Sequence, residues 1–227
     1  TRHRGDDQPG ATRVSELDVG YADRCFQDVR PCGDGMVSHS NAKVLRLMLA
    51  DGIGHGQTAH NAVKLLKQKF SWFCERSQTM GGLAQCIQEM HDWMKDRGPS
   101  NQAAVAVIEL NGTSGVLSAL SVGNVKAHLI GHHSILTIPT LNGMVGGRLP
   151  ASLPLTVEQL KPWSLLVVHS DGISARALHP YLKSLPMSHT HIAGEAQLLA
   201  QKIVERFGKS SDDASCAVVV LDAGDPA

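Results

Sequence analysis

The chain has 227 residues, of which 42% are hydrophobic and 19% are charged, so it is long enough and apolar enough for one domain with a substantial core. Lys and Arg total 21, as do Asp and Glu, whereas proteins that bind nucleic acid usually carry a basic excess. No apolar run approaches the roughly 20 residues that span a bilayer, and residues 1–13 do not resemble a signal peptide. We therefore expect a cytoplasmic protein that binds neither membrane nor nucleic acid, with its five cysteines as reduced thiols.

The first half of the chain predicts a flexible N-terminal tail, then strands, then two helices. We expect the tail over 1–13 and the folded domain over 14–222, followed by a C-terminal tail over 223–227. The expected strands cover 14–21, 25–30 and 43–50. Apolar residues then recur at helical spacing, which predicts helices over 56–73 and 83–94.

The apolar period changes after residue 102. Consecutive strands punctuated by turn dipeptides are expected over 103–110, 114–121, 125–130 and 134–138. The segment 139–162, with four Pro and three Gly, is expected to be irregular. A buried strand over 164–169, a helix ending near Phe207 and a strand over 214–221 complete the chain. This order lacks the regular alternation of parallel βαβ units and indicates an α+β layered sandwich of mostly antiparallel strands.

Acidic residues stand at the ends of several expected strands. Asp51 and Asp171 each follow an apolar strand and precede Gly, Asp34 lies within CGDGM, and the pair Asp212-Asp213 precedes the last strand. A single Asp-Gly is most often a turn, but several acids at one sheet edge would repel unless a cation joined them. Oxygen ligands favour Mg²⁺ or Mn²⁺, and two such ions about 4 Å apart activate water for attack on a phosphate.

The glycine loop DGIGHG at 51–56 also invites comparison with a dinucleotide-binding loop. Its spacing is not G-x-G-x-x-G, and Asp51 would place a negative charge against the pyrophosphate. The sequence therefore argues against a dinucleotide site.

Five motifs together resemble those of bacterial PP2C-type serine/threonine protein phosphatases of the SpoIIE/RsbU/RsbX branch, in the same order and over nearly the whole chain. They are CGDGM (32–36), LADGIGHG (49–56), SVGNVKAHL (121–129), VVHSDGIS (167–174) and SDDASCAVVV (211–220). The resemblance implies a PP2C-like αββα sandwich, two mostly antiparallel sheets flanked by helices, that acts as a metal-dependent phosphoserine/phosphothreonine phosphatase.

The resemblance also implies a site built on two Mn²⁺ or Mg²⁺ ions. Asp51 resembles the carboxylate that bridges both ions, and Asp34 and the Gly52 carbonyl resemble ligands of one of them. Asp171 and Asp212 resemble ligands of the other ion. The expected substrate is a phosphorylated STAS-domain protein, an anti-anti-sigma factor or a stressosome component of a partner-switching pathway.

The chain departs from animal and plant relatives in two places. Ile53 stands where those enzymes have a His proposed as the general acid, and the upstream phosphate-binding Arg has only Arg30 as a candidate here. His55 is a candidate proton donor, and its alternative is a loop residue that stabilises local backbone. Two other functions stay open, a catalytically silent PP2C-like module that binds partners and a metal-dependent phosphoesterase for small molecules.

Overall fold

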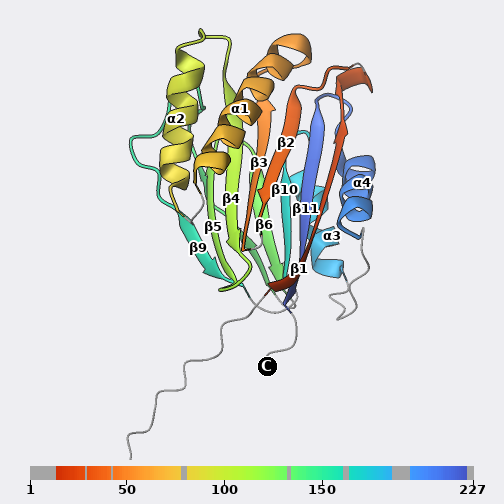
Figure 1. Ribbon diagram of the computed structural model, residues 1–227. Helices are drawn as coiled ribbons and strands as arrows, with labels where there is room; N and C mark the ends of the chain where they lie inside the picture. Colours follow the sequence, from red (N-terminus) through yellow and green to blue (C-terminus); the bar gives the residue numbers. More distant parts are fainter. Residues whose placement is uncertain are drawn as a thin grey trace, which may run out of the picture.

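The computed structural model describes residues 14–28, 30–41, 43–77, 81–131, 134–160, 164–185 and 195–223. Two β-sheets stack face to face, and a pair of helices covers the outer side of each sheet (Figure 1). This is the αββα sandwich that the sequence predicts.

The first sheet carries most of the N-terminal half of the chain. It has the order β2-β3-β4-β5-β8, with β9 also paired to β5, and every pairing except β5 with β8 is antiparallel. Helices α1 (Gly56–Arg76) and α2 (Leu83–Lys95) pack on its outer face. The strands are β2 (Asp34–Ser40), β3 (Val44–Gly52), β4 (Ala103–Asn111), β5 (Val116–Val122), β8 (Thr140–Leu141) and β9 (Thr156–Gln159).

The second sheet joins the two ends of the described chain. Its order is β1-β11-β10-β6-β7, antiparallel throughout, and helices α3 (Ala175–Ser184) and α4 (Glu195–Phe207) cover its outer face. The strands are β1 (Val14–Arg24), β6 (Lys126–Gly131), β7 (Ser134–Thr137), β10 (Ser164–His169) and β11 (Ala214–Ala223).

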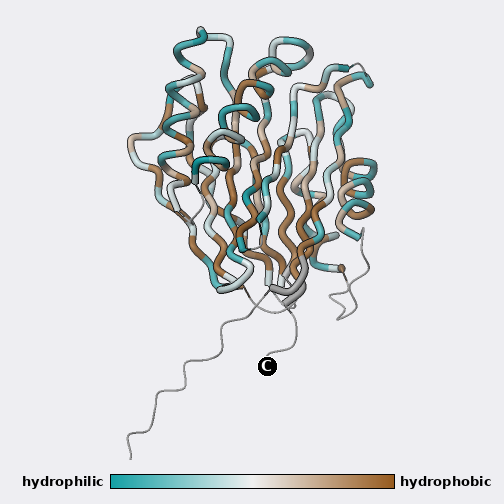
Figure 2. Tube along the Cα trace, viewed as in Figure 1, coloured by the Kyte–Doolittle hydropathy of each residue, from teal (hydrophilic) through white to brown (hydrophobic). Residues whose placement is uncertain are grey.

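Three apolar layers hold the sandwich together, one between the sheets and one under each helix pair. Strand β3 contributes side chains to two of these layers. Leu47 and Leu49 pack between the sheets, whereas Met48 and Ala50 pack under α1 and α2, because successive side chains of a strand point to opposite faces. A central strand buried on both faces reads as a continuous apolar run. Hydrophobic residues are accordingly concentrated in the strands of the two sheets (Figure 2).

Three expectations about secondary structure were wrong. In the expected strand over 25–30, whose residue 29 lies outside the described part, residues Phe26–Asp28 form a 3-10 turn, η1, with Gln27 and Asp28 at positive φ. The irregular segment 139–162 contributes β8 and β9, which are too short for a periodic signal. Helix α3 was not predicted, because it has only ten residues, contains Pro180 and buries just Leu178 and Leu182.

Candidate functional site

Four aspartates from both sheets meet at one edge of the sandwich. Asp34 begins β2 and stands opposite Asp51 in the register of β2 with β3. Asp171 lies two residues after the end of β10, and Asp212 lies two residues before β11, at the end of both strands where His169 pairs with Cys216. Within each sheet the antiparallel register places the end of one strand beside the start of another, as expected. The expectation of a single sheet edge was wrong, because the aspartates come as two pairs from two stacked sheets.

Burial and repulsion by neighbouring carboxylates disfavour negative charge on three of these carboxyls, those of Asp34, Asp51 and Asp212. Burial raises the pKa of Asp34 to about 7. The pKa of Asp51 rises to about 9, first because the side chain is desolvated and then because Asp34, Asp171 and Asp212 repel its negative charge. The pKa of Asp212 is also raised, by burial and by Asp171.

A divalent cation fits this arrangement. Within the described part of the chain, Oδ2 of Asp34 is buried and has no hydrogen-bond partner. A buried polar atom without a partner is unfavourable unless an ion or water meets it. Oxygen-only donors with raised pKa values are the set expected where Mg²⁺ or Mn²⁺ takes the place of protons.

Gly52 is fixed between β2 and α1. Its N–H donates to the carbonyl of Gly33 over 3.1 Å, which ties the loop after β3 to the residue before Asp34. A Cβ at Gly52 would lie 2.6 Å from the carbonyl oxygen of Ala59 in α1. Only glycine allows the helix to approach the loop this closely.

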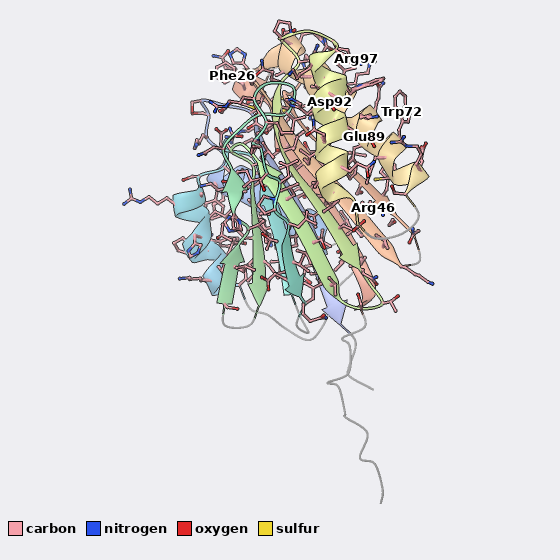
Figure 3. All side chains as sticks on the ribbon, turned by 90° about the vertical axis from the view of Figure 1, so that its left-hand side faces the viewer. Phe26, Arg46, Trp72, Glu89, Asp92 and Arg97 are labelled. Carbon is pink, nitrogen blue, oxygen red and sulfur yellow. The ribbon has the colours of Figure 1, made fainter. Side chains whose placement is uncertain are left out.

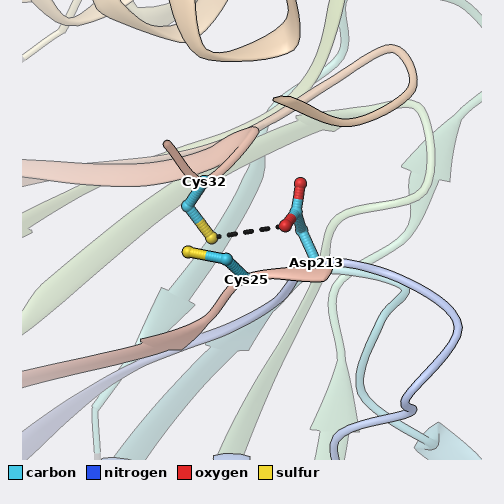
Figure 4. A group of neighbouring side chains, drawn as sticks. All are labelled: Cys25, Cys32 and Asp213. Atoms are coloured by element: carbon cyan, nitrogen blue, oxygen red, sulfur yellow. Dashed lines mark hydrogen bonds between the residues drawn. The ribbon is translucent and has the colours of Figure 1, made fainter. Parts of the chain in front are cut away.

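Asp213 acts differently from its neighbour Asp212. Its Oδ1 accepts a hydrogen bond from the Phe26 N–H over 2.6 Å and one from the Cys32 thiol over 3.5 Å (Figure 4). Its Oδ2 accepts the Gly33 N–H over 2.8 Å. Asp213 therefore fastens the loop that leads to Asp34.

A second group of possible ligand atoms lies nearby. The sulfur atoms of Cys25 and Cys32 and a carboxylate oxygen of Asp213 lie within 4.8 Å of one another, a spacing that a metal ion would also allow. Both oxygens of Asp213 already accept hydrogen bonds from the protein, so we interpret this group as a structural contact and not as a metal site. Burial raises the pKa of the Cys32 thiol, which keeps this side chain a hydrogen-bond donor.

Two residues that the sequence did not single out hold Asp171. The Asn124 side-chain amide donates to Oδ2 of Asp171 over 2.7 Å, and the Lys209 ammonium donates to the backbone carbonyl of Asp171 over 2.5 Å. Lys209 also donates its backbone N–H to the carbonyl of Gly172. Asn124 lies inside the motif SVGNVKAHL, which was a signal for it, whereas nothing local in the sequence indicates Lys209.

Exposed side chains form a rim beside the aspartates. Ile53 is 50% exposed, and the rings of Phe26 and His55 stack with their centroids 4.5 Å apart. The Arg30 guanidinium forms an ion pair with Asp23 at 2.9 Å, so this candidate phosphate anchor is engaged elsewhere. His55 precedes α1 and makes no side-chain cap.

The fold is an α+β sandwich with four aspartates clustered at one end, an arrangement that a divalent cation fits, and comparison with known proteins gives the family. The sequence model of the family described as Stage II sporulation protein E (SpoIIE) matches residues 41–222, most of the chain. The chain therefore belongs to the SpoIIE family of bacterial PP2C-type serine/threonine protein phosphatases. None of the helices in the described segments is long and apolar enough to cross a membrane.

Individual relatives are distant in sequence and similar in fold. The phosphoserine phosphatase RsbX of Bacillus subtilis (strain 168) is 22% identical over 154 residues, which cover 67% of this chain and 72% of RsbX. A crystal structure of RsbX in complex with magnesium is 18% identical, with a TM-score of 0.74 over 92% of this chain and 99% of that one. A solved structure described as "The bacterial stressosome: a modular system that has been adapted to control secondary messenger signaling" is 23% identical, with a TM-score of 0.75 over 90% of this chain and 100% of that one.

Proposed function

We propose that residues 14–222 form a phosphatase domain that removes phosphate from serine or threonine of a regulatory protein, with two divalent metal ions as cofactors. The facing pair Asp34 and Asp51 carries this proposal. Both carboxyls have raised pKa values, and one oxygen of Asp34 is buried without a partner within the described chain. A pocket of this kind favours the bound cation over the free acid.

The side chains at the sheet edge divide into metal ligands and the groups that hold them. In the proposal Asp51 would serve as a ligand of both ions, Asp34 and the Gly52 carbonyl would be further ligands of one ion, and Asp171 and Asp212 would be further ligands of the other. When bound, Mg²⁺ or Mn²⁺ supplies Lewis-acid activation of water and neutralises charge on the phosphoryl group.

The chain's own residues position these ligands. Asn124 and Lys209 orient Asp171 through its side chain and its backbone carbonyl. Asp213 fastens the backbone of Phe26 and Gly33, which sets the position of Asp34. Such supporting contacts commonly change metal affinity or activity by about 10- to 100-fold when removed.

For the substrate, we propose a phosphorylated STAS-domain protein in a cytoplasmic partner-switching pathway. The similarity to RsbX and to a stressosome chain supports this class of partner. Phosphotyrosine should be a poor substrate, because the longer aromatic side chain holds its phosphate farther from the backbone of the substrate.

A substrate panel tests the proposal. The full chain is assayed with Mn²⁺ or Mg²⁺ against a phosphoserine STAS protein, a phosphotyrosine peptide, a nucleotide and para-nitrophenyl phosphate. We expect hydrolysis of the phosphoserine protein, loss of turnover on addition of EDTA, and no detectable turnover by Asp51→Asn.

Each alternative function predicts a different result in the same panel. A partner-binding module would bind the STAS protein and hydrolyse nothing. A small-molecule phosphoesterase would prefer the nucleotide. Near-normal activity of Asp51→Asn would contradict the two-metal assignment.

A further inference from the structure

A pocket of about 490 Å³ opens at the same end of the molecule as the aspartates and belongs to none of the groups described above. It is lined by Lys95, Pro99, Gln102, Gly146, Gly147 and Arg148. These residues come from the end of α2, the segment that leads into β4, and the loop that follows β8. Figure 3 shows that Arg97, in the first of these segments, lies at the same end of the molecule as Phe26 on the rim of the site.

Backbone contacts join this pocket to the metal-binding loop. The carbonyl of Gln102 accepts the N–H of Ile53 over 3.1 Å, and Ala103 stands opposite Gly52 in the register of β3 with β4. Ala103 in turn exchanges two backbone hydrogen bonds with Val145, over 3.1 and 3.0 Å. Gln102, which lines the pocket, therefore connects it directly to the loop that holds Asp51 and Gly52.

The walls of the pocket are preformed. The N–H of Gly146 donates to Nδ1 of His91 over 3.1 Å, and the side-chain amide of Gln102 donates to the carbonyl of Pro99 over 2.7 Å. Gly146 has a φ of +82°, and a Cβ at Gly147 would collide with the Gln102 side chain. A pocket fixed in this way loses little conformational entropy when a ligand enters.

The charge of the pocket is positive. Lys95 and Arg148 are its charged lining residues, and neither forms an ion pair with any residue that the structure describes. Arg97, between Lys95 and Pro99, is engaged instead with Trp93, because its guanidinium lies 3.1 Å from the centre of the indole ring. Two cations that form no ion pair within the described segments, beside the proposed phosphate site, suit a second anionic group of the same substrate.

We propose that this pocket is a specificity subsite for an acidic side chain of the protein substrate, close in sequence to the phosphorylated residue. This inference rests on the proposed phosphatase function and goes beyond it by naming a chemical requirement of the substrate. The half-exposed Ile53 follows Gly52 and donates its N–H to the carbonyl of Gln102, so its side chain would meet a substrate that reaches from the aspartates to the pocket. The anionic group is a carboxylate or a second phosphate, since both carry the charge that Lys95 and Arg148 recognise.

Kinetics on matched peptides test the subsite. The full chain is assayed on phosphoserine peptides in which a single Glu, Gln or phosphoserine is moved through the positions flanking the target. We expect a preference for Glu over Gln of about tenfold in kcat/KM at one or two positions, as two partly exposed ion pairs would supply. A phosphoserine arm that exceeds the Glu arm at the same position identifies phosphate as the preferred anion.

Charge-reversal variants assign the preference to the pocket. Lys95→Glu with Arg148→Glu should abolish or invert the Glu-to-Gln ratio, and the milder pair Lys95→Gln with Arg148→Gln should bring it to about one. The matched control is Lys183→Glu with Lys202→Glu, an equal charge change on the exposed faces of α3 and α4, which should retain the ratio. Because each ratio compares two peptides on one enzyme, a general loss of activity cancels.

A binding measurement keeps the inference separate from the phosphatase activity. The metal-free chain is titrated with unphosphorylated Glu and Gln peptides, and the amide signals of Gly146 and Gly147 are followed by NMR. Shifts with the Glu peptide alone support the subsite even if no peptide is hydrolysed, an outcome that would overturn only the proposed function. Equal kinetic ratios in wild type and the charge-reversed pair, or no amide shifts, would overturn the subsite while leaving a working phosphatase intact.

Discussion

Asp34 and Asp51 stand directly opposite each other on adjacent antiparallel strands, and the folded chain raises the pKa of the first to about 7 and of the second to about 9. Both pKa values exceed the usual value of 3.8 for an aspartate. The folded protein without metal therefore keeps protons on these carboxyls at pH values where the unfolded chain has released them.

The stability of the metal-free protein should consequently fall as the pH rises from about 4 toward 9. The free energy of unfolding should fall by at most about 1.4 kcal/mol per pH unit for each of the two carboxyls that is still protonated in the folded state. Urea denaturation in EDTA at pH 5 and pH 8 measures this difference. Asp51→Asn should reduce the slope and raise stability at pH 8, whereas the exposed Asp92→Asn should keep the wild-type slope. An unchanged slope in Asp51→Asn would contradict the raised pKa of Asp51, which burial and then repulsion by the other carboxyls cause.

The two consecutive aspartates before β11 should behave differently when mutated. Asp213→Ala removes the acceptor of two backbone N–H groups, those of Phe26 and Gly33, and should lower the free energy of unfolding by about 2–4 kcal/mol. Asp212→Asn should leave the stability of the metal-free protein nearly unchanged and weaken Mn²⁺ binding. Urea denaturation and calorimetric Mn²⁺ titration of both variants provide the comparison, and equal destabilisation by the two would contradict the assignment.

Asn124 should support the site through Asp171. Asn124→Ala removes the amide that donates to Oδ2 of Asp171, so we expect about 10- to 100-fold weaker apparent Mn²⁺ affinity. Saturating Mn²⁺ should recover much of the activity, because the ligand itself remains. An activity loss that excess Mn²⁺ does not reduce would assign Asn124 to another part of the reaction.

The buried ion pair between Arg46 and Glu109 should matter for stability far from the site. The Glu109 carboxylate accepts a hydrogen bond from the Arg46 guanidinium over 2.7 Å and one from the N–H of Gly81 over 2.6 Å. These bonds tie the connection between α1 and α2 to the sheet, on the side of the molecule where Figure 3 shows Arg46. Glu109→Gln should cost about 3–5 kcal/mol, because it leaves Arg46 buried against a neutral side chain.

The matched control for this pair is Glu89→Gln. Glu89 pairs with Lys69 and Arg76 near the surface, where such pairs contribute at most about 1 kcal/mol. Thermal denaturation of both variants gives the ratio of the two effects. A cost at Glu109 no larger than that at Glu89 would show that the buried pair is not important for stability.

Much of the fold follows from local patterns. The apolar run of β3, the helical spacing in α1 and α2 and the turn dipeptides after residue 102 predict their elements, because each records which face of the segment is buried. The positions of the aspartates at strand ends likewise predict that they meet in pairs, Asp34 with Asp51 and Asp171 with Asp212, since antiparallel pairing brings the start of one strand beside the end of another. That the two pairs belong to two different sheets follows only from how the sheets stack.

Tertiary structure alone decided the contacts that complete the site. Asp213 captures the backbone of Phe26, 187 residues away, and so turns an apparent strand into the loop that presents Asp34. Asn124 reaches Asp171 across 47 residues, and the cationic pocket forms only where Lys95 and Arg148 come together from distant segments. Local sequence encodes the burial pattern of each element, whereas these contacts depend on how the elements pack, and no residue pattern of a single segment contains that information.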